Sequence, residues 1–342
     1  MILPREHRAE DGRFVSGEQA KARLNWTDAK PAGKFAGVNW IRNTLATVLL
    51  SALATGVTAE TKPVDAGAAA VEREFRELLK LDDRVHDEVD KWIRDNAALA
   101  EVDAGITRDS LSAQVRIRLQ KVENAYVAFV AKHPKHLEAR LAFGSYYSGL
   151  GEADKAIGQW IEARQIDRNN PVPWNNLGKA YGQKGNVSES IRHFTKATEI
   201  APNQSLYYRN LAAMLFAYPD HAARHYLIDR NLIVPKVISL FKKARELDPK
   251  NFPLAADAAM AYLATKPLQS KEAITAWNEA LALAPDDRSK QGVRIHLARI
   301  HAHIGGSKTA RDILSKVNDP KLAGLKEEIL KKLDAPTAPA KP

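Results

Sequence analysis

A glycine-rich stretch near the middle of the chain could form a loop that binds phosphate. It reads WNNLGKAYGQKG over residues 174–185 and contains Gly178 and Gly185. A phosphate loop of the G-x4-G-K-[ST] type lies between a strand and a helix, so that its backbone N–H groups face the phosphates. No strand is predicted before this stretch, and Gly178 falls inside a predicted helix while Gly185 falls at the end of one. We therefore predict that these glycines pack or end helices and bind no phosphate.

Five histidines in two groups raise the question of a metal site. His221 and His225 are four residues apart and would share one side of a helix, but no nearby carboxylate is arranged with them as a clear third ligand. In the stretch HLARIHAHIGG, His301 is predicted to pack in the core, and only His296 and His303 share a face, two turns apart. The sequence thus predicts no metal and no cofactor.

Motifs that carry catalysis are absent from the sequence. There is no cysteine, which excludes a thiol nucleophile, disulfides and cysteine-ligated zinc. The G-x-S-x-G elbow, the H-E-x-x-H zinc motif and a glycine-rich dinucleotide turn are missing as well. The formal net charge of +10 over 342 residues favours acidic partners in general and does not indicate nucleic-acid binding. We predict that the protein is not an enzyme.

The residues around the opening glycines recur with a period of 34 positions. In the first half of the repeat, the later residues Trp174, Leu177, Gly178 and Tyr181 align with Arg140, Phe143, Gly144 and Tyr147. In the second half, Ser190, Phe194, Ala197 and Pro202 align with Ala156, Trp160, Ala163 and Arg168. This spacing resembles the tetratricopeptide repeat, whose pattern is W-x2-L-G-x2-Y, then A-x3-F-x2-A, then P. It departs from that pattern at Arg140 and Arg168.

The resemblance implies an all-α fold, a right-handed α-solenoid of about five helix-turn-helix repeats. The predicted units are 137–170, 171–204, 205–251 with an insertion over 217–233, 252–287 and 291–320. A helical amino-terminal cap is predicted over 60–136, a capping helix over 321–333 and a disordered tail over 334–342. Within the cap, 67–98 and 108–133 have apolar residues at helical spacing; the stripe of the first is Phe75, Leu78, Leu79, Val85, Val89, Trp92 and Ile93.

The repeat pattern has a direct physical explanation. Small residues such as Gly144 and Ala163 let helix backbones approach closely, and aromatic residues such as Trp160 and Phe194 fill the gaps between those contacts. Trp174, Leu177, Gly178 and Tyr181 are predicted to be packing residues in the same way. Gly151 and Gly185 are expected to end helices in the left-handed conformation that glycine adopts at least cost.

The resemblance also implies where a partner would bind. In the family, the first helices of successive repeats line a concave groove, and fixed positions in each helix point into it. The groove residues predicted for this chain are Asn175, Lys179, Gln183, Arg209, Glu138, Leu141, Ser145, Ala256, Met260, Leu263, Ile295, Arg299 and His303. Amide side chains can bond an extended peptide backbone, and Lys179 with Arg209 could pair a carboxylate.

Two kinds of function are therefore weighed. The first is a non-catalytic scaffold that binds a protein or peptide in this groove, and this ligand could be acidic. The second is a structural subunit that self-associates or joins an envelope assembly. The fold alone does not decide between them, because tetratricopeptide solenoids serve many partners.

The amino-terminal segment contains an uncharged run, NTLATVLLSALATGVTA, over residues 43–59. Lys34 and Arg42 precede it, and Val57-Thr58-Ala59 suits a signal-peptidase site. We predict first a cleaved signal peptide, with a membrane anchor or an ordinary buried helix as the alternatives. The uncharged run is short for a membrane span, which needs about 20 apolar residues. The leader 1–42 is expected to be poorly ordered. The sequence predicts an exported protein whose membrane contact is limited to this segment.

Overall fold

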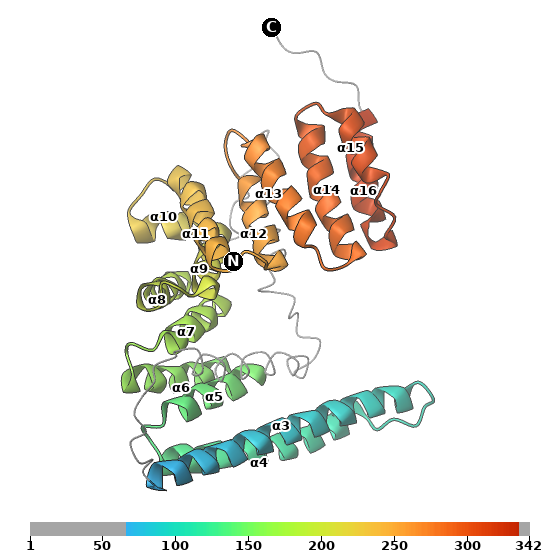
Figure 1. The fold of residues 1–342 in the computed structure, drawn as a ribbon. Coiled ribbons are helices and arrows are strands. Elements are labelled where there is room, and N and C mark those ends of the chain that lie inside the picture. Colours follow the sequence, from blue (N-terminus) through green and yellow to red (C-terminus); the bar gives the residue numbers. More distant parts are fainter. Residues whose placement is uncertain (1–65, 335–342) are drawn as a thin grey trace, which may run out of the picture. The chain divides into compact units, whose positions relative to one another are not determined.

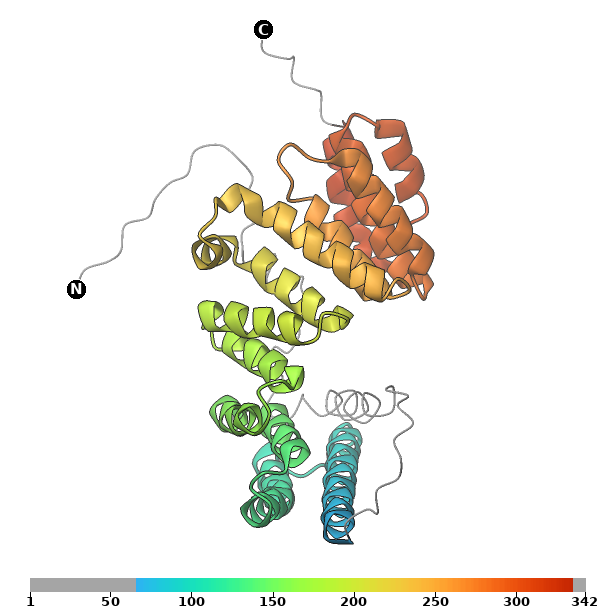
Figure 2. The ribbon, with the colours of Figure 1, turned by 60° about the vertical axis from the view of Figure 1, so that its left-hand side comes forward.

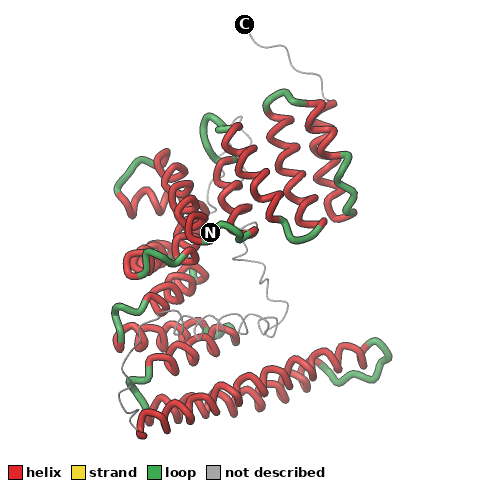
Figure 3. The backbone as a smooth tube through the Cα atoms, viewed as in Figure 1, coloured by secondary structure: helices red, strands yellow, loops and turns green. Residues whose placement is uncertain are grey.

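The computed structural model describes residues 66–334, and all regular structure within them is helical (Figures 1 and 3). The predicted all-α fold class is confirmed. The described residues divide into two compact units, 66–180 and 181–334, whose boundary falls within helix α7. The predicted leader 1–42, the uncharged run 43–59, residues 60–65 of the predicted cap and residues 335–342 of the predicted tail 334–342 lie outside the described residues.

The first unit begins with two long antiparallel helices, α3 (Ala66–Ala100) and α4 (Arg108–Lys132). Thr107 caps α4 by accepting a hydrogen bond from the backbone N–H of Ser110. Most of the predicted stripe on α3 is buried against α4, and the rest is half-buried. The buried members are Phe75, Leu78, Val85 and Val89.

Helices α5 (Leu137–Gly149) and α6 (Ala153–Ile166) show how the repeat packs. A Cβ atom at Gly144 would lie 2.3 Å from Nε1 of Trp160, so only glycine lets the two helices approach this closely. The Trp160 indole N–H donates to the carbonyl of Leu141 at 3.3 Å. Gly151 ends the first helix with a φ of +76°, as predicted. α7 (Pro171–Gln183) follows.

The second unit continues the series of helix pairs (Figure 2). Consecutive helices pack against each other, α12 on α13 and α14 on α15, and α9 pairs with α11 across the insertion. Their bounds are α8 Val187–Ile200, α9 Ser205–Ala217, α10 Pro219–Tyr226, α11 Ile233–Leu247, α12 Phe252–Tyr262, α13 Ser270–Leu283, α14 Asp287–His303, α15 Ser307–Leu314 and α16 Ala323–Asp334, with short 3-10 helices η2 Arg230–Leu232 and η3 Pro320–Leu322.

The predicted insertion 217–233 contains α10 and η2. Ala222 of α10 is buried in the same core as Phe194 of α8 and Phe241 of α11, so the inserted helix is packed onto the repeat. Two bounds differ from the expectation: α14 begins at Asp287, four residues before the predicted fifth unit, and Asp334, predicted to start the tail, is the last residue of α16. Both helices are longer than predicted because their ends are capped or paired. Asp286, for example, caps the start of α14 by accepting a hydrogen bond from the Ser289 N–H at 2.7 Å.

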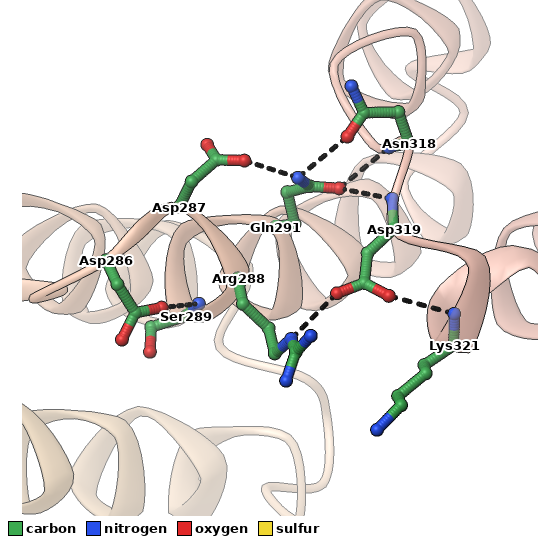
Figure 4. Close-up of polar contacts among 8 residues, drawn as sticks. All are labelled: Asp286, Asp287, Arg288, Ser289, Gln291, Asn318, Asp319 and Lys321. Carbon is green, nitrogen blue, oxygen red and sulfur yellow. Dashed lines mark hydrogen bonds and ion pairs between the residues drawn. The ribbon is translucent and has the colours of Figure 1, made fainter.

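A buried glutamine holds the carboxyl-terminal helices together (Figure 4). The Gln291 carbonyl oxygen on α14 accepts from the backbone N–H groups of Asn318 and Asp319 at 2.7 and 2.8 Å. Its amide nitrogen donates to Asp287 Oδ2 and Asn318 Oδ1. All the polar atoms of this side chain are thus bonded, and the turn that leads into α16 is fixed on α14.

No helix within residues 66–334 is long and apolar enough to cross a membrane.

Candidate functional site

Helix α7 has buried packing residues and, on one face, half-buried polar residues. Leu177, Gly178 and Ala180 are buried, whereas Asn175 and Lys179 are half-buried and four residues apart, on one face of the helix. The Asn175 amide donates to the Asn176 carbonyl oxygen at 3.5 Å, a long contact. This face therefore combines an amide and an amine outside the packed core.

Lys179 is the ionisable group on this face. Burial lowers the pKa of its amine to about 8, since the ammonium form loses hydration there. At neutral pH the amine is still protonated. A partly desolvated ammonium gains more from a carboxylate than a fully hydrated one, because the cost of removing its water has already been met in the fold.

Trp174 is only half-buried, although the repeat pattern predicts a packing residue. Its indole N–H donates to the carbonyl of Arg168 at 3.0 Å, and the Arg164 guanidinium lies 5.0 Å from the ring centroid. The tryptophan thus packs against the end of α6 through a cation–π contact rather than inside the core.

On α5, the predicted groove residues differ in exposure. Glu138 is exposed in the first turn, with its carboxylate 3.6 Å from Nδ1 of His136. Ser145 is half-buried and its hydroxyl donates to the Leu141 carbonyl at 3.1 Å. The prediction for Leu141 is wrong, because its side chain is buried in the core of the first unit.

In the second unit, Arg209 on α9 is already engaged. Its Nε–H donates to Oδ2 of Asp257 on α12 at 2.7 Å. Burial raises the pKa of Asp257, and the positive charge of Arg209 opposes that shift. Sequence reasoning missed Asp257, although a single charge within the apolar stretch FPLAADAAMAY could have marked it.

The remaining predicted residues of the second unit are spread over three helices. Gln183 is exposed at the end of α7, and Met260 is half-buried against the α12–α13 core. Arg299 on α14 lies 3.8 Å from the Glu328 carboxylate of α16. The prediction for Ile295 is wrong, because α16 closes over α14 and buries it in a cluster with Leu314, Val317 and Ile329.

The tetratricopeptide repeat family model matches residues 171–204, which hold α7 and α8. This segment carries the aromatic and small residues that set the spacing above, and packed helix pairs come before and after it in the chain. Residues 171–204 are a tetratricopeptide repeat. The polar face formed by Asn175 and Lys179 therefore lies in the repeat that the family model matches.

Several solved structures are similar to this chain at low identity. They include YrrB, a TPR protein with an unusual peptide-binding site, PilF of Pseudomonas aeruginosa and MamA of Desulfovibrio magneticus RS-1. Identities are 15%, 14% and 16%, with TM-scores of 0.49, 0.48 and 0.45. The alignments cover 60%, 72% and 58% of this chain and 98%, 97% and 97% of the other chains. Similarity of this degree carries no inference about the partner. No curated protein sequence matches the chain.

A buried polar cluster between α3, α4 and α5 was not predicted. The Tyr126 hydroxyl donates to Asp82 Oδ2 at 2.7 Å, and His86 Nδ1 lies 2.7 Å from Asp82 Oδ1. Burial lowers the pKa of His86, but its hydrogen bond to Asp82 and the Asp82 charge outweigh this and raise it. The His86 ring also meets the edge of Tyr146 at 5.9 Å. These contacts tie the three helices together within the core.

Three of the five histidines considered for metal binding take part in ring contacts. His221 and His225 meet the edges of Tyr218 and Tyr226, at centroid distances of 6.0 and 4.8 Å. His296 stacks on Trp277 at 4.2 Å. Across residues 66–334, no group of three His, Cys, Asp or Glu side chains could hold a metal ion.

Proposed function

We propose that this protein is a non-catalytic scaffold that binds a protein or peptide segment along the first helices of its repeats. The observation that carries the proposal is the polar face of α7, where Asn175 and Lys179 lie outside the packed core of the matched repeat. The buried positions of this helix are Pro173, Leu177, Gly178 and Ala180.

The chemistry of this face suits an extended acidic peptide. The Asn175 amide can both donate to and accept from a peptide backbone. The Lys179 ammonium, whose pKa is lowered by burial, can pair with a carboxylate of the ligand. On α5 in the same unit, Glu138 and Ser145 would contact flanking residues of the ligand. Arg209, which lies in the other unit and is paired with Asp257, is not part of this proposal.

A peptide array tests the proposal. Acidic peptides and their charge-reversed counterparts are displayed on a membrane and probed with the unaltered protein, Lys179→Met and Lys184→Met. The Lys184 control removes the same charge from an exposed position in the turn after α7. We expect Lys179→Met to bind acidic peptides about tenfold less tightly, the size of one charge-assisted hydrogen bond, and Lys184→Met to bind as the unaltered protein does. Equal binding by the two variants would remove Lys179 from the site.

A second candidate function is self-assembly, which the outer face of α4 favours. Ile117 and Val127 are 74% and 49% exposed there. One exposed stripe is uncharged and has residues of the same kind at matching positions from its two ends, namely Ala113, Ile117, Gln120, Asn124, Val127 and Ala131. An antiparallel pairing with a second copy of the chain requires such a self-complementary face. Sedimentation equilibrium across a concentration series tests it: a dimer that Ile117→Glu dissociates supports it, and a monomer at all concentrations contradicts it.

We further propose that the protein is exported, with residues 43–59 acting as a signal peptide or anchor. The support is the uncharged run itself, with basic residues before it and small residues at its end. Amino-terminal sequencing of the native protein, with cell fractionation, tests this: a new terminus near Glu60 shows a cleaved signal peptide, and an intact leader in the membrane fraction supports an anchor. An intact leader in the cytoplasmic fraction contradicts export.

A further inference from the structure

Leu227, at the end of the inserted helix α10, has an unusual backbone conformation. Its φ and ψ are 53° and 42°, the left-handed region, and its side chain is 91% exposed. A bulky residue in this region costs conformational energy, and glycine or asparagine cost least. An exposed leucine adds the unfavourable hydration of its apolar surface.

The turn itself requires the left-handed conformation but not the leucine. The Leu227 N–H bonds the carbonyl of Arg224 at 3.4 Å, and the next N–H, of Ile228, bonds the carbonyl of Ala223 at 3.1 Å. This pattern ends a helix through one left-handed residue, and the apolar contact that accompanies it comes from Ile228, which packs on the core. Folding therefore requires the left-handed backbone at residue 227 and the side chain of Ile228, but not the side chain of Leu227.

A second exposed leucine lies five residues further on. Leu232 is 54% exposed, although the next residue, Ile233, is fully buried. Between the two leucines, Asp229 accepts from the Asn231 N–H at 2.7 Å, and Arg230 pairs with Asp220 of α10 at 2.6 Å. These bonds hold the segment 227–232, here called the leucine loop, in a defined shape that presents both leucines outward.

The leucine loop belongs to the basic unit of the protein. Residues 181–334 contain 24 Lys and Arg against 16 Asp and Glu, whereas residues 66–180 contain 17 against 18. Arg230 and Asp229 lie within the loop, and Arg224, Lys236 and Asp220 lie near it in sequence; the Lys236 ammonium is 4.2 Å from the Tyr226 ring centroid. The two leucines thus project from a unit that carries an excess of basic side chains.

We propose that the leucine loop binds the surface of an anionic lipid membrane, with Leu227 and Leu232 inserted among the acyl chains and the basic residues at the headgroups. A protein partner would need a contiguous surface of about 800 Å² on each side. The loop offers two leucines separated by charged residues. A bilayer accepts single apolar side chains and rewards each nearby Lys or Arg when its lipids are acidic. This binding is separate from the peptide-binding face of α7.

Co-sedimentation with lipid vesicles tests the proposal on the full chain. The vesicles are phosphatidylcholine alone or phosphatidylcholine with phosphatidylserine. The variants are Leu227→Asn and Leu232→Asn, with Ile304→Asn as a matched control at a leucine-sized residue that is 47% exposed at the end of α14. Residues 43–59 are the same in all variants, so differences between variants report the loop.

We expect the unaltered chain and Ile304→Asn to bind the acidic vesicles at least fivefold better than phosphatidylcholine, and each leucine variant to lose at least fivefold of that binding. Leu227→Asn should melt no lower than the unaltered chain, because asparagine tolerates the left-handed conformation. Equal vesicle binding by all variants would overturn the proposal and attribute binding to residues 43–59 or to charge alone. Absence of binding by the unaltered chain would also overturn it and favour a protein ligand for the leucines.

Discussion

Arg209 and Asp257 form an ion pair between the first helices of two consecutive repeats, with Nε 2.7 Å from Oδ2. Both side chains are largely shielded from water, so each compensates the desolvation of the other. The pair links α9 to α12 in addition to the apolar contacts of the repeat.

Removing one partner should therefore be more harmful than removing both. We expect Arg209→Met to lower the free energy of unfolding by about 1–3 kcal/mol, because Asp257 is left buried and charged. The double variant with Asp257→Leu should recover part of the loss. Urea unfolding of the four proteins in a double-mutant cycle measures the coupling. Additive losses would show that the two residues do not depend on each other.

Gly144 and Gly158 make a matched pair for the packing argument. A methyl group at Gly144 would collide with the Trp160 ring, whereas one at Gly158 meets nothing within 4 Å. We expect Gly144→Ala to destabilise the protein by about 1–3 kcal/mol. Gly158→Ala should stabilise it by about 0.5–1 kcal/mol, since alanine favours an exposed helix. Thermal or urea unfolding of both variants measures these changes in stability. Equal effects at the two sites would contradict the close approach of α5 and α6.

The repeat pattern predicts which side chains pack because helical periodicity fixes which face meets the neighbouring helix. Leu177, Phe194 and Gly144 occupy their expected buried places for this reason. The same periodicity cannot tell whether another helix covers the remaining face. Ile295 was predicted in the groove and is buried, because α16 packs over α14.

Long-range polar partners are even less accessible to sequence reasoning. Asp257 lies 48 residues after Arg209, and Tyr126 lies 44 residues after Asp82. The first separation is close to the length of the predicted unit 205–251, so the spacing places both residues on the first helices of consecutive repeats without pairing them. The second pair lies in the predicted cap, where the repeat pattern does not apply. Their pairing depends on which turn of one helix lies opposite which turn of the other. Only the packed structure shows this alignment.

Lys179 gives the stability of the protein a dependence on pH. Burial lowers its pKa to about 8 from an ordinary value of 10.5, so the unfolded chain binds this proton more tightly. The folded state is therefore penalised below pH 8, and the penalty disappears as the pH rises from about 8 to 10.5. We expect Lys179→Met to raise the free energy of unfolding by about 1–3 kcal/mol at pH 7 and to lose the rise seen between pH 8 and 10.5.

Urea unfolding at several pH values between 6.5 and 10.5 measures this difference. Lys184→Met is the control, because it removes an exposed amine from the neighbouring turn. A Lys179→Met protein whose stability follows the same pH curve as the control would contradict the shifted pKa.

Gln291 should control the local stability of the carboxyl-terminal helix. Its carbonyl oxygen accepts the Asn318 and Asp319 N–H groups that lead into α16 (Figure 4). We expect Gln291→Leu to cost about 2–3 kcal/mol, since two backbone donors lose their partner. Hydrogen exchange should show faster exchange over residues 318–333, with α8 and α9 unchanged. Arg288→Gln, which removes only the exposed ion pair to Asp319, should leave exchange as it is. Equal exchange in the two variants would show that α16 is held by its apolar contacts alone.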